Sequence, residues 1–225
     1  MRGHLCGLPA FAREFPHWYD SAGSHAATAV TLFTMIWQCG WMLTAGMLLA
    51  QGAPVAGQVE AIDSAREAVR ESTAVLGADH PATAMMLRNL ALAFEQGGYH
   101  NYAEHYAQRS LAILEASFGP EDVSLVPALN VLAETYAAQD RLTEARAIAT
   151  RAAAIGPAAG PHYATALHNL AAIFQSEGKF KEAAEFYRRA LSAREALLPP
   201  GHPYILITRA ALRQVQRAGR LSAHR

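Results

Sequence analysis

The 225-residue sequence lacks an excess of basic residues, since 19 lysines and arginines balance 19 aspartates and glutamates. Nucleic-acid-binding proteins usually carry such an excess, so the composition argues against that class. Cysteine is nearly absent, and both copies, Cys6 and Cys39, lie before residue 50. The rest of the chain therefore has no disulfide framework. Hydrophobic residues make up 52% of the chain, which argues against global disorder.

The short motifs that identify common catalytic and metal sites are also missing. The chain has ten histidines but no HExxH and no histidine pair four residues apart. No serine stands in G-x-S-x-G, and Gly97-Gly98 is not followed by the GK[ST] of a phosphate loop. We therefore predict no catalytic residue, no metal and no cofactor. An enzyme, or a substrate-docking module of an enzyme, is the disfavoured alternative.

Alanine is the residue that the sequence has in excess, with 48 copies. Alanine is the best helix former, and its small side chain lets helices approach closely. The composition therefore predicts an all-α protein made of closely packed helices.

Residues 21–59 contain no charged side chain, and residues 26–50 within them are mostly apolar. A helix of 25 such residues, rising about 1.5 Å each, is long enough to cross a bilayer. We predict that residues 1–52 form a targeting region whose segment 26–50 is either a cleaved signal or a retained membrane anchor. The domain that follows is then exported: periplasmic, extracellular or anchored to the membrane.

Two other interpretations of this region are disfavoured. A buried hydrophobic helix would concentrate its polar residues on one face, whereas those of residues 26–50 are scattered. A lipid anchor needs small residues before its cysteine, and Cys39 follows Trp37 and Gln38.

The sequence after residue 58 is repetitive. Its three best copies share the pattern leucine-x-x-leucine-alanine-x-x-aromatic, whose spacing places the named residues on one face of a helix. The second leucine of the pattern, with a fourth partial copy, is Leu90, Leu132, Leu170 and Leu212, at intervals of 42, 38 and 42 residues. A turn residue follows eight positions later, and then a second helix. The turn residue is Gly98, Asp140 or Gly178.

This pattern resembles the tetratricopeptide repeat in the 42-residue form of kinesin light chains. The resemblance covers residues 58–218, so residues 53–218 are predicted to form the repeat domain. It implies a right-handed α-solenoid of antiparallel helix hairpins, with a helix A and a helix B in each of about three full repeats. The small residue of helix A is Ala91, Ala133 or Ala171, and that of helix B is Ala103, Ala145 or Ala183. The family implies a scaffold for protein–protein interaction.

Three features depart from a regular repeat array. The middle repeat is four residues short, so its helix B is predicted to have lost one turn. Glu60-Ala61 stands at the same distance before His80-Pro81 as Glu182-Ala183 does before His202-Pro203. Residues 58–76 are therefore predicted to be a lone helix B. Residues 203–218 are predicted to be a final helix A whose polar residues close the solenoid, followed by a tail over residues 219–225.

Stacked hairpins leave a concave groove lined mainly by helix A. The resemblance implies that an asparagine of helix A holds the backbone of an extended peptide in this groove. We predict a protein or peptide partner there, bound by residues that share this face: Arg88, Asn89, Asn130, Glu134, His168 and Asn169. We also expect that alanine at Arg88, Asn130 and His168 leaves the fold stable.

Two alternatives stay open for the groove and for the chain. The six residues can be ordinary surface polar groups, with the chain acting as a spacer or as a self-associating, homo-oligomeric component of the cell envelope. A membrane is a partner only if the N-terminal segment is retained.

Overall fold

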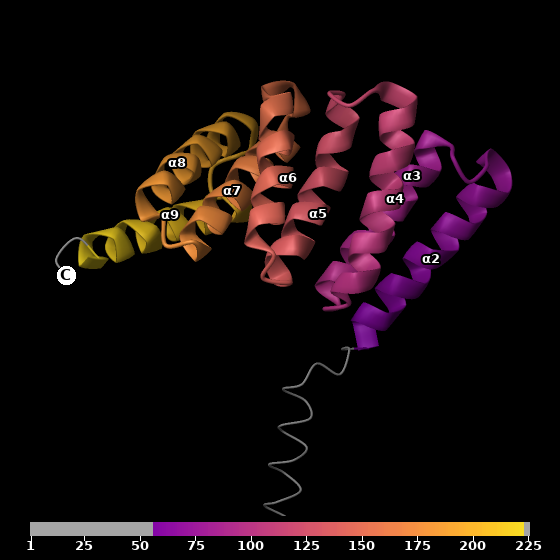
Figure 1. Cartoon of the computed structure of the whole chain (residues 1–225), viewed down its shortest axis with the longest axis horizontal. Coiled ribbons are helices and arrows are strands. Elements are labelled where there is room, and N and C mark those ends of the chain that lie inside the picture. Colours follow the sequence, from indigo (N-terminus) through magenta and orange to yellow (C-terminus); the bar gives the residue numbers. More distant parts are fainter. Residues whose placement is uncertain (1–55, 223–225) are drawn as a thin grey trace, which may run out of the picture. The chain divides into compact units, whose positions relative to one another are not determined.

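The computed structural model describes residues 56–222, which belong to one compact unit beginning at Pro54. This part of the chain contains eight α-helices, two short 3-10 helices and no strand (Figure 1). The elements are α2 (Ala56–Leu76), α3 (Pro81–Gln96), α4 (His100–Phe118), η3 (Val123–Leu125), α5 (Val126–Ala138), α6 (Leu142–Ile155), η4 (Pro157–Ala159), α7 (Pro161–Ser176), α8 (Phe180–Leu197) and α9 (Pro203–Ser222). The all-α prediction is confirmed.

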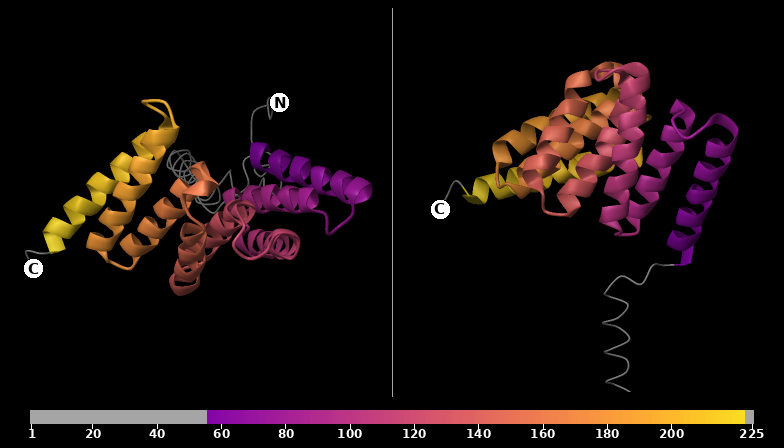
Figure 2. Two further views of the ribbon diagram at one scale, coloured as in Figure 1. Left: turned by 90° about the horizontal axis from the view of Figure 1, so that it is seen from above. Right: turned by 45° about the vertical axis from the view of Figure 1, so that its right-hand side comes forward.

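Consecutive helices form antiparallel hairpins that stack side by side along an arc (Figure 2). Helices α3, α5 and α7 are the helices A of the three full repeats, and α4, α6 and α8 are their helices B. The second leucine of the sequence pattern is buried in every full repeat, because it lies on the face of helix A that packs against the neighbouring helices. These leucines are Leu90, Leu132 and Leu170. The predicted small residues are fully buried: Ala91, Ala133, Ala171, Ala103, Ala145 and Ala183 are each 0% exposed.

The turn between helix A and helix B has the same geometry in all three repeats. Gly98 and Gly178 have φ values of 78° and 75°, and Asp140 adopts φ 60° at the equivalent place. In each case the amide of the residue after the turn donates to the carbonyl of the repeat's aromatic residue, as in Tyr99 N to Phe94 O at 2.9 Å. Glycine adopts this left-handed conformation without steric strain, whereas an aspartate in the same conformation is strained by its Cβ atom.

The middle repeat is shortened where the sequence predicted it. Helix α6 has 14 residues, whereas α4 has 19 and α8 has 18. The missing length is about one turn, and the single 3-10 turn η4 then connects α6 to α7.

Both ends of the array are half repeats. Helix α2 packs on α3 as a lone helix B, and α9 packs on α8 as a lone helix A. Proline stands at the first position of α3 and of α9, where its missing N–H costs nothing. The histidine before each proline explains the recurring His-Pro pair, because its Nδ1 accepts the amide of the second helical residue. His80 accepts from Ala82 at 3.1 Å, and His202 accepts from Tyr204 at 3.2 Å.

The outer face of α9 is less polar than predicted. Four arginines lie on this helix, but Leu206 and Ile207 are 51% and 53% exposed. The helix also runs to Ser222, past the predicted domain end at residue 218. Polar residues are exposed in the later turns of α9, as at Arg213, Gln214 and Arg217, whereas its first turns also expose apolar side chains.

The predicted targeting region, residues 1–52 with the hydrophobic segment 26–50, lies outside the described residues. Among the helices of residues 56–222, none is both long enough and apolar enough to cross a membrane.

Candidate functional site

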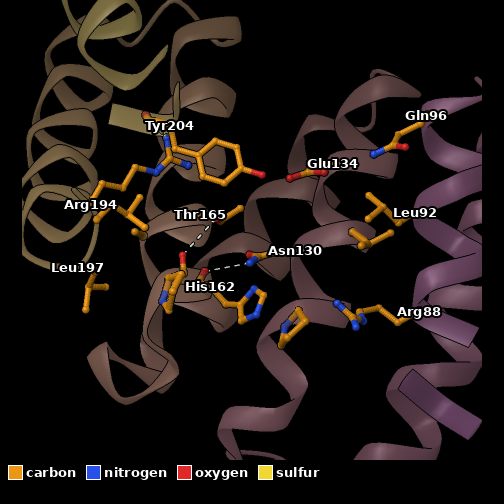
Figure 3. A pocket seen from close by; sticks show the side chains of 15 residues that line it. Arg88, Leu92, Gln96, Asn130, Glu134, His162, Thr165, Arg194, Leu197 and Tyr204 are labelled. Atoms are coloured by element: carbon orange, nitrogen blue, oxygen red, sulfur yellow. Dashed lines mark hydrogen bonds between the residues drawn. The ribbon is translucent and has the colours of Figure 1, made fainter. Parts of the chain in front are cut away.

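A pocket of about 330 Å³ lies on the inner side of the arc, where the three helices A meet the C-terminal helices. Figure 3 shows Arg88 and Leu92 on one side of it, Arg194 and Tyr204 on the opposite side, and Asn130 between them. Its lining comes from every repeat: Arg88, Leu92 and Gln96 of α3; Pro127, Asn130, Val131 and Glu134 of α5; Pro161, His162, Ala164 and Thr165 of α7; Arg194 and Leu197 of α8; Leu198; and Tyr204 of α9.

Asn130 lies at the floor of the pocket and is only 4% exposed. Its Nδ2 donates to the main-chain carbonyl of His162 at 2.9 Å, which ties α5 to the start of α7. Its Oδ1 is buried and accepts no hydrogen bond from any described residue. A buried acceptor without a donor is rare in a folded protein, and an enclosed water is a usual partner for such an atom.

Glu134 lies one turn further along α5. Its Oε1 accepts a hydrogen bond of 2.8 Å from Nδ2 of Asn169, which comes from the neighbouring helix A. Burial raises the pKa of the Glu134 carboxyl; the bond from Asn169 offsets part of that rise, and the charge of Glu95 adds to it. Asn169 is thus a buried group that orients Glu134 from behind the pocket surface.

Arg88 brings a positive charge to the opposite wall. Its guanidinium is partly buried, and burial lowers its pKa. No carboxylate among the described residues forms an ion pair with Arg88. The pKa of His162 is lowered first by burial and then by the charge of Arg88, both of which favour the neutral imidazole. The wall therefore presents a cation without a counter-ion inside the domain.

A second arginine, Arg194 of α8, is 5% exposed and tightly held. It donates to the carbonyl of Tyr204 at 3.0 Å and to the hydroxyl of Thr208, which fixes α9 against α8. Nδ1 of His168 lies 3.4 Å from Nη1 of Arg194. Burial, together with the charge of Arg194, lowers the pKa of His168 to about 4. The contacts of both side chains are thus with other residues of the domain. Arg194 also lines the pocket.

The structure divides the six predicted groove residues into three groups. Arg88, Asn130 and Glu134 line the pocket. His168 and Asn169 lie behind its surface and bond to Arg194 and Glu134. Asn89 is exposed and does not line the pocket.

The expectation that Asn130 and His168 are dispensable for the fold conflicts with the burial of Asn130 and with the contacts that both side chains make. Each makes a contact to a different helix, so their truncation removes structural hydrogen bonds as well as any contact to a ligand.

The sequence analysis missed Arg194, His162 and Tyr204. One signal for Arg194 was available, because it stands in the third repeat where the first repeat has the buried Leu114. A charged residue at a core position of a repeat indicates a local partner or a site. His162 and Tyr204 carry no such signal, since they lie at helix starts whose position in space depends on stacking.

A metal site is not formed by the described residues, where no three histidine, cysteine, aspartate or glutamate side chains cluster. The geometry instead defines an all-α repeat solenoid whose inner face carries a pocket with a mixed polar and apolar lining. The sequence profile of the tetratricopeptide repeat family matches residues 57–116 and 124–196. The chain therefore belongs to the tetratricopeptide repeat family.

Solved structures with the same fold are distant in sequence. One holds the nearly identical TPR-like repeats of a protein named as a kinesin light chain in Podosopora anserina; it is 23% identical with a TM-score of 0.57, and the match covers 74% of this chain and 81% of that one. Another, BtubC (BKLC) from P. vanneervenii, is 19% identical with a TM-score of 0.61, covering 73% and 67% of the two chains. No curated protein matches the sequence. These likenesses establish the fold.

Proposed function

We propose that the chain is a scaffold that binds an extended segment of a partner protein in the pocket on its inner face. The observation that carries this proposal is the Arg88 guanidinium in the pocket lining, which has no carboxylate partner in the described part of the chain. Tetratricopeptide repeats generally mediate protein–protein interaction, which is consistent with a protein ligand.

An extended peptide fits the chemistry of this pocket. Such a peptide has unpaired N–H and C=O groups along its length, and its side chains alternate in direction. Arg88 offers donors and a charge, and Leu92 and Leu197 offer apolar contacts on the two sides. The volume of about 330 Å³ is at the lower end for a ligand site, so only a short stretch of the peptide is enclosed.

The experiment is a pull-down with the full chain, followed by titration of the captured partner against variants. Arg88→Ala should weaken binding by about tenfold or more, because an unpaired charged group contributes on the order of 1–3 kcal/mol when a ligand satisfies it. Glu134→Gln retains an acceptor for Asn169 and tests the charge of the pocket alone.

Arg109 of α4 provides the matched control, since it is exposed and lies outside the pocket lining. Arg109→Ala should bind the partner as the wild type does. If Arg88→Ala and Arg109→Ala bind equally well, the interface lies on another surface and the pocket proposal fails.

A further inference from the structure

The two end helices of the solenoid are complementary halves of one hairpin. Helix α2 is a helix B that lacks its preceding helix A, and α9 is a helix A that lacks its following helix B. We propose that α9 of one copy packs against α2 of a second copy, so that the chains associate head to tail.

The α2 end is acidic. The helix carries two arginines and four carboxylates, a net charge of −2, and all four carboxylates are exposed: Glu60, Asp63, Glu67 and Glu71. Both arginines already pair within the helix, Arg66 with Asp63 at 3.4 Å and Arg70 with Glu67 at 3.0 Å. Glu60 and Glu71 form no ion pair with any residue of the described part.

The α9 end is basic. This helix has four arginines and no acidic residue, a net charge of +4. Arg209 pairs with Glu195 at 2.6 Å. Arg213, Arg217 and Arg220 are exposed and have no ion-pair partner within residues 56–222. The charges at the two ends are therefore opposite in sign, which favours contact between ends and opposes contact between like ends.

Side-chain volumes also match across the proposed contact. In the third repeat, the small Ala171 of helix A and the large Tyr187 of helix B belong to the same buried cluster. The equivalent position of α9 holds the large Arg213, and that of α2 holds the small Ala65. In the proposed pair the large residue is therefore on helix A (α9) and the small residue on helix B (α2), the reverse of the third repeat. The small Ala65 leaves space for Arg213.

A second position of α2 is also reduced in size, because α2 has Ser64 where α8 has Phe186. Ala61 of α2 is exposed, although its equivalents in the other helices B are fully buried against their own helix A. The face of α2 that would pack against a helix A therefore carries small side chains and is open to solvent, with Glu60 and Glu71 beside it.

An antiparallel hairpin sets the direction of the contact. The arginine-rich C-terminal half of α9 then lies over the N-terminal half of α2, where Glu60 is found. The exposed Leu206 and Ala210 lie over the other end of α2, near Ala74 and the exposed Val75. The contact is heterologous, so it extends into a row of copies unless the geometry closes a ring.

Sedimentation velocity of the full chain in a mild non-ionic detergent tests this proposal. The average mass should rise with protein concentration beyond that of a dimer, and it should fall as salt is added, because salt screens the facing charges. The variant Arg213→Glu/Arg217→Glu/Arg220→Glu should weaken association by at least about tenfold, since like charges then face each other.

The variant Glu60→Arg/Glu67→Arg/Glu71→Arg should weaken association to a similar degree. A mixture of the two variants should associate again, because each supplies the end that the other lacks; this recovery also shows that both variants are folded. A control with the same charge change on exposed side chains of α4 and α8, Arg109→Glu/Lys181→Glu/Arg188→Glu, should behave as the wild type does.

Three results would overturn the proposal. A wild type that stays monomeric over the whole concentration range shows that α2 and α9 do not bind each other. Association that survives both charge reversals places the contact elsewhere, for instance in residues 1–55. If the control variant loses association to the same degree as the variants of α2 and α9, the loss is an effect of net charge alone. None of these variants changes the pocket lining, so the outcome is independent of the proposed peptide binding.

Discussion

Ala171→Leu tests the packing on which the repeat register depends. Ala171 of α7 is 0% exposed and belongs to a buried cluster with Ala183 and Tyr187 of α8 and Val215 of α9. Leucine adds three carbon atoms at a place where three helices meet and where its neighbours are themselves buried. Such overpacking costs about 1–3 kcal/mol of unfolding free energy.

This cost converts into a measurable change of the melting temperature. For a domain of this size, 1 kcal/mol corresponds to about 2–4 °C, so the midpoint by circular dichroism should fall by about 2–12 °C. Ala147→Leu is the matched control, because Ala147 is exposed in the middle of α6 and the change in helix propensity is the same. The control should leave the midpoint within about 2 °C of the wild type.

Hydrogen exchange locates the effect. A repeat array transmits a local loss of stability mainly to its nearest neighbours, so amides of α7, α8 and α9 should lose protection more than those of α3 and α4. An unchanged midpoint for Ala171→Leu, or a midpoint lowered equally by Ala147→Leu, would show that the buried small-residue position has been assigned to the wrong place.

Three further predictions concern a turn, a half-buried histidine and the location of the domain. Asp140→Gly should raise the free energy of unfolding by about 0.5–1 kcal/mol, because it removes a left-handed aspartate at φ 60°, and Gly98→Asp should lower it at the equivalent turn. Denaturant titration measures both, and a fall for Asp140→Gly or a rise for Gly98→Asp would refute the strain. The pKa of His168 is lowered from its usual 6.5 to about 4, so the unfolded chain binds the proton more readily between these values and stability should fall as pH drops from 6.5 to 4, by up to about 3 kcal/mol. His168→Asn should flatten that part of the stability curve, and an unchanged slope would assign it to other groups. We also propose that the domain after residues 26–50 is exported, for which a C-terminal alkaline phosphatase fusion should be active; activity of a cytoplasmic reporter in its place would contradict export.

The sequence alone determined the architecture, because the features that specify it are local. The spacing of Leu90, Leu132 and Leu170 places apolar residues on one face of each helix A, and a helix with one apolar face must pack against a neighbour. The loss of four residues from the middle repeat shortens one helix by one turn, whatever surrounds it. Proline and histidine at the starts of α3 and α9 act through bonds within their own first turn.

The composition of the pocket was decided by the tertiary structure. Asn130 and the His162 carbonyl are 32 residues apart, and Asn169 and Glu134 are 35 apart, so only the stacking of helices A brings each pair together. Stacking also decides which polar residue of helix A faces the pocket and which is enclosed. Asn89 and Asn169 occupy equivalent positions in the sequence pattern, yet the first is exposed and the second is buried against α5.

The same reason explains the two ends. The arginines of α9 and the carboxylates of α2 are visible in the sequence, but a charge pattern on a helix does not reveal which side its neighbours cover. Only the packed structure shows that Arg213 and Glu60 point away from the domain, because the burial of a side chain depends on helices that are distant along the chain.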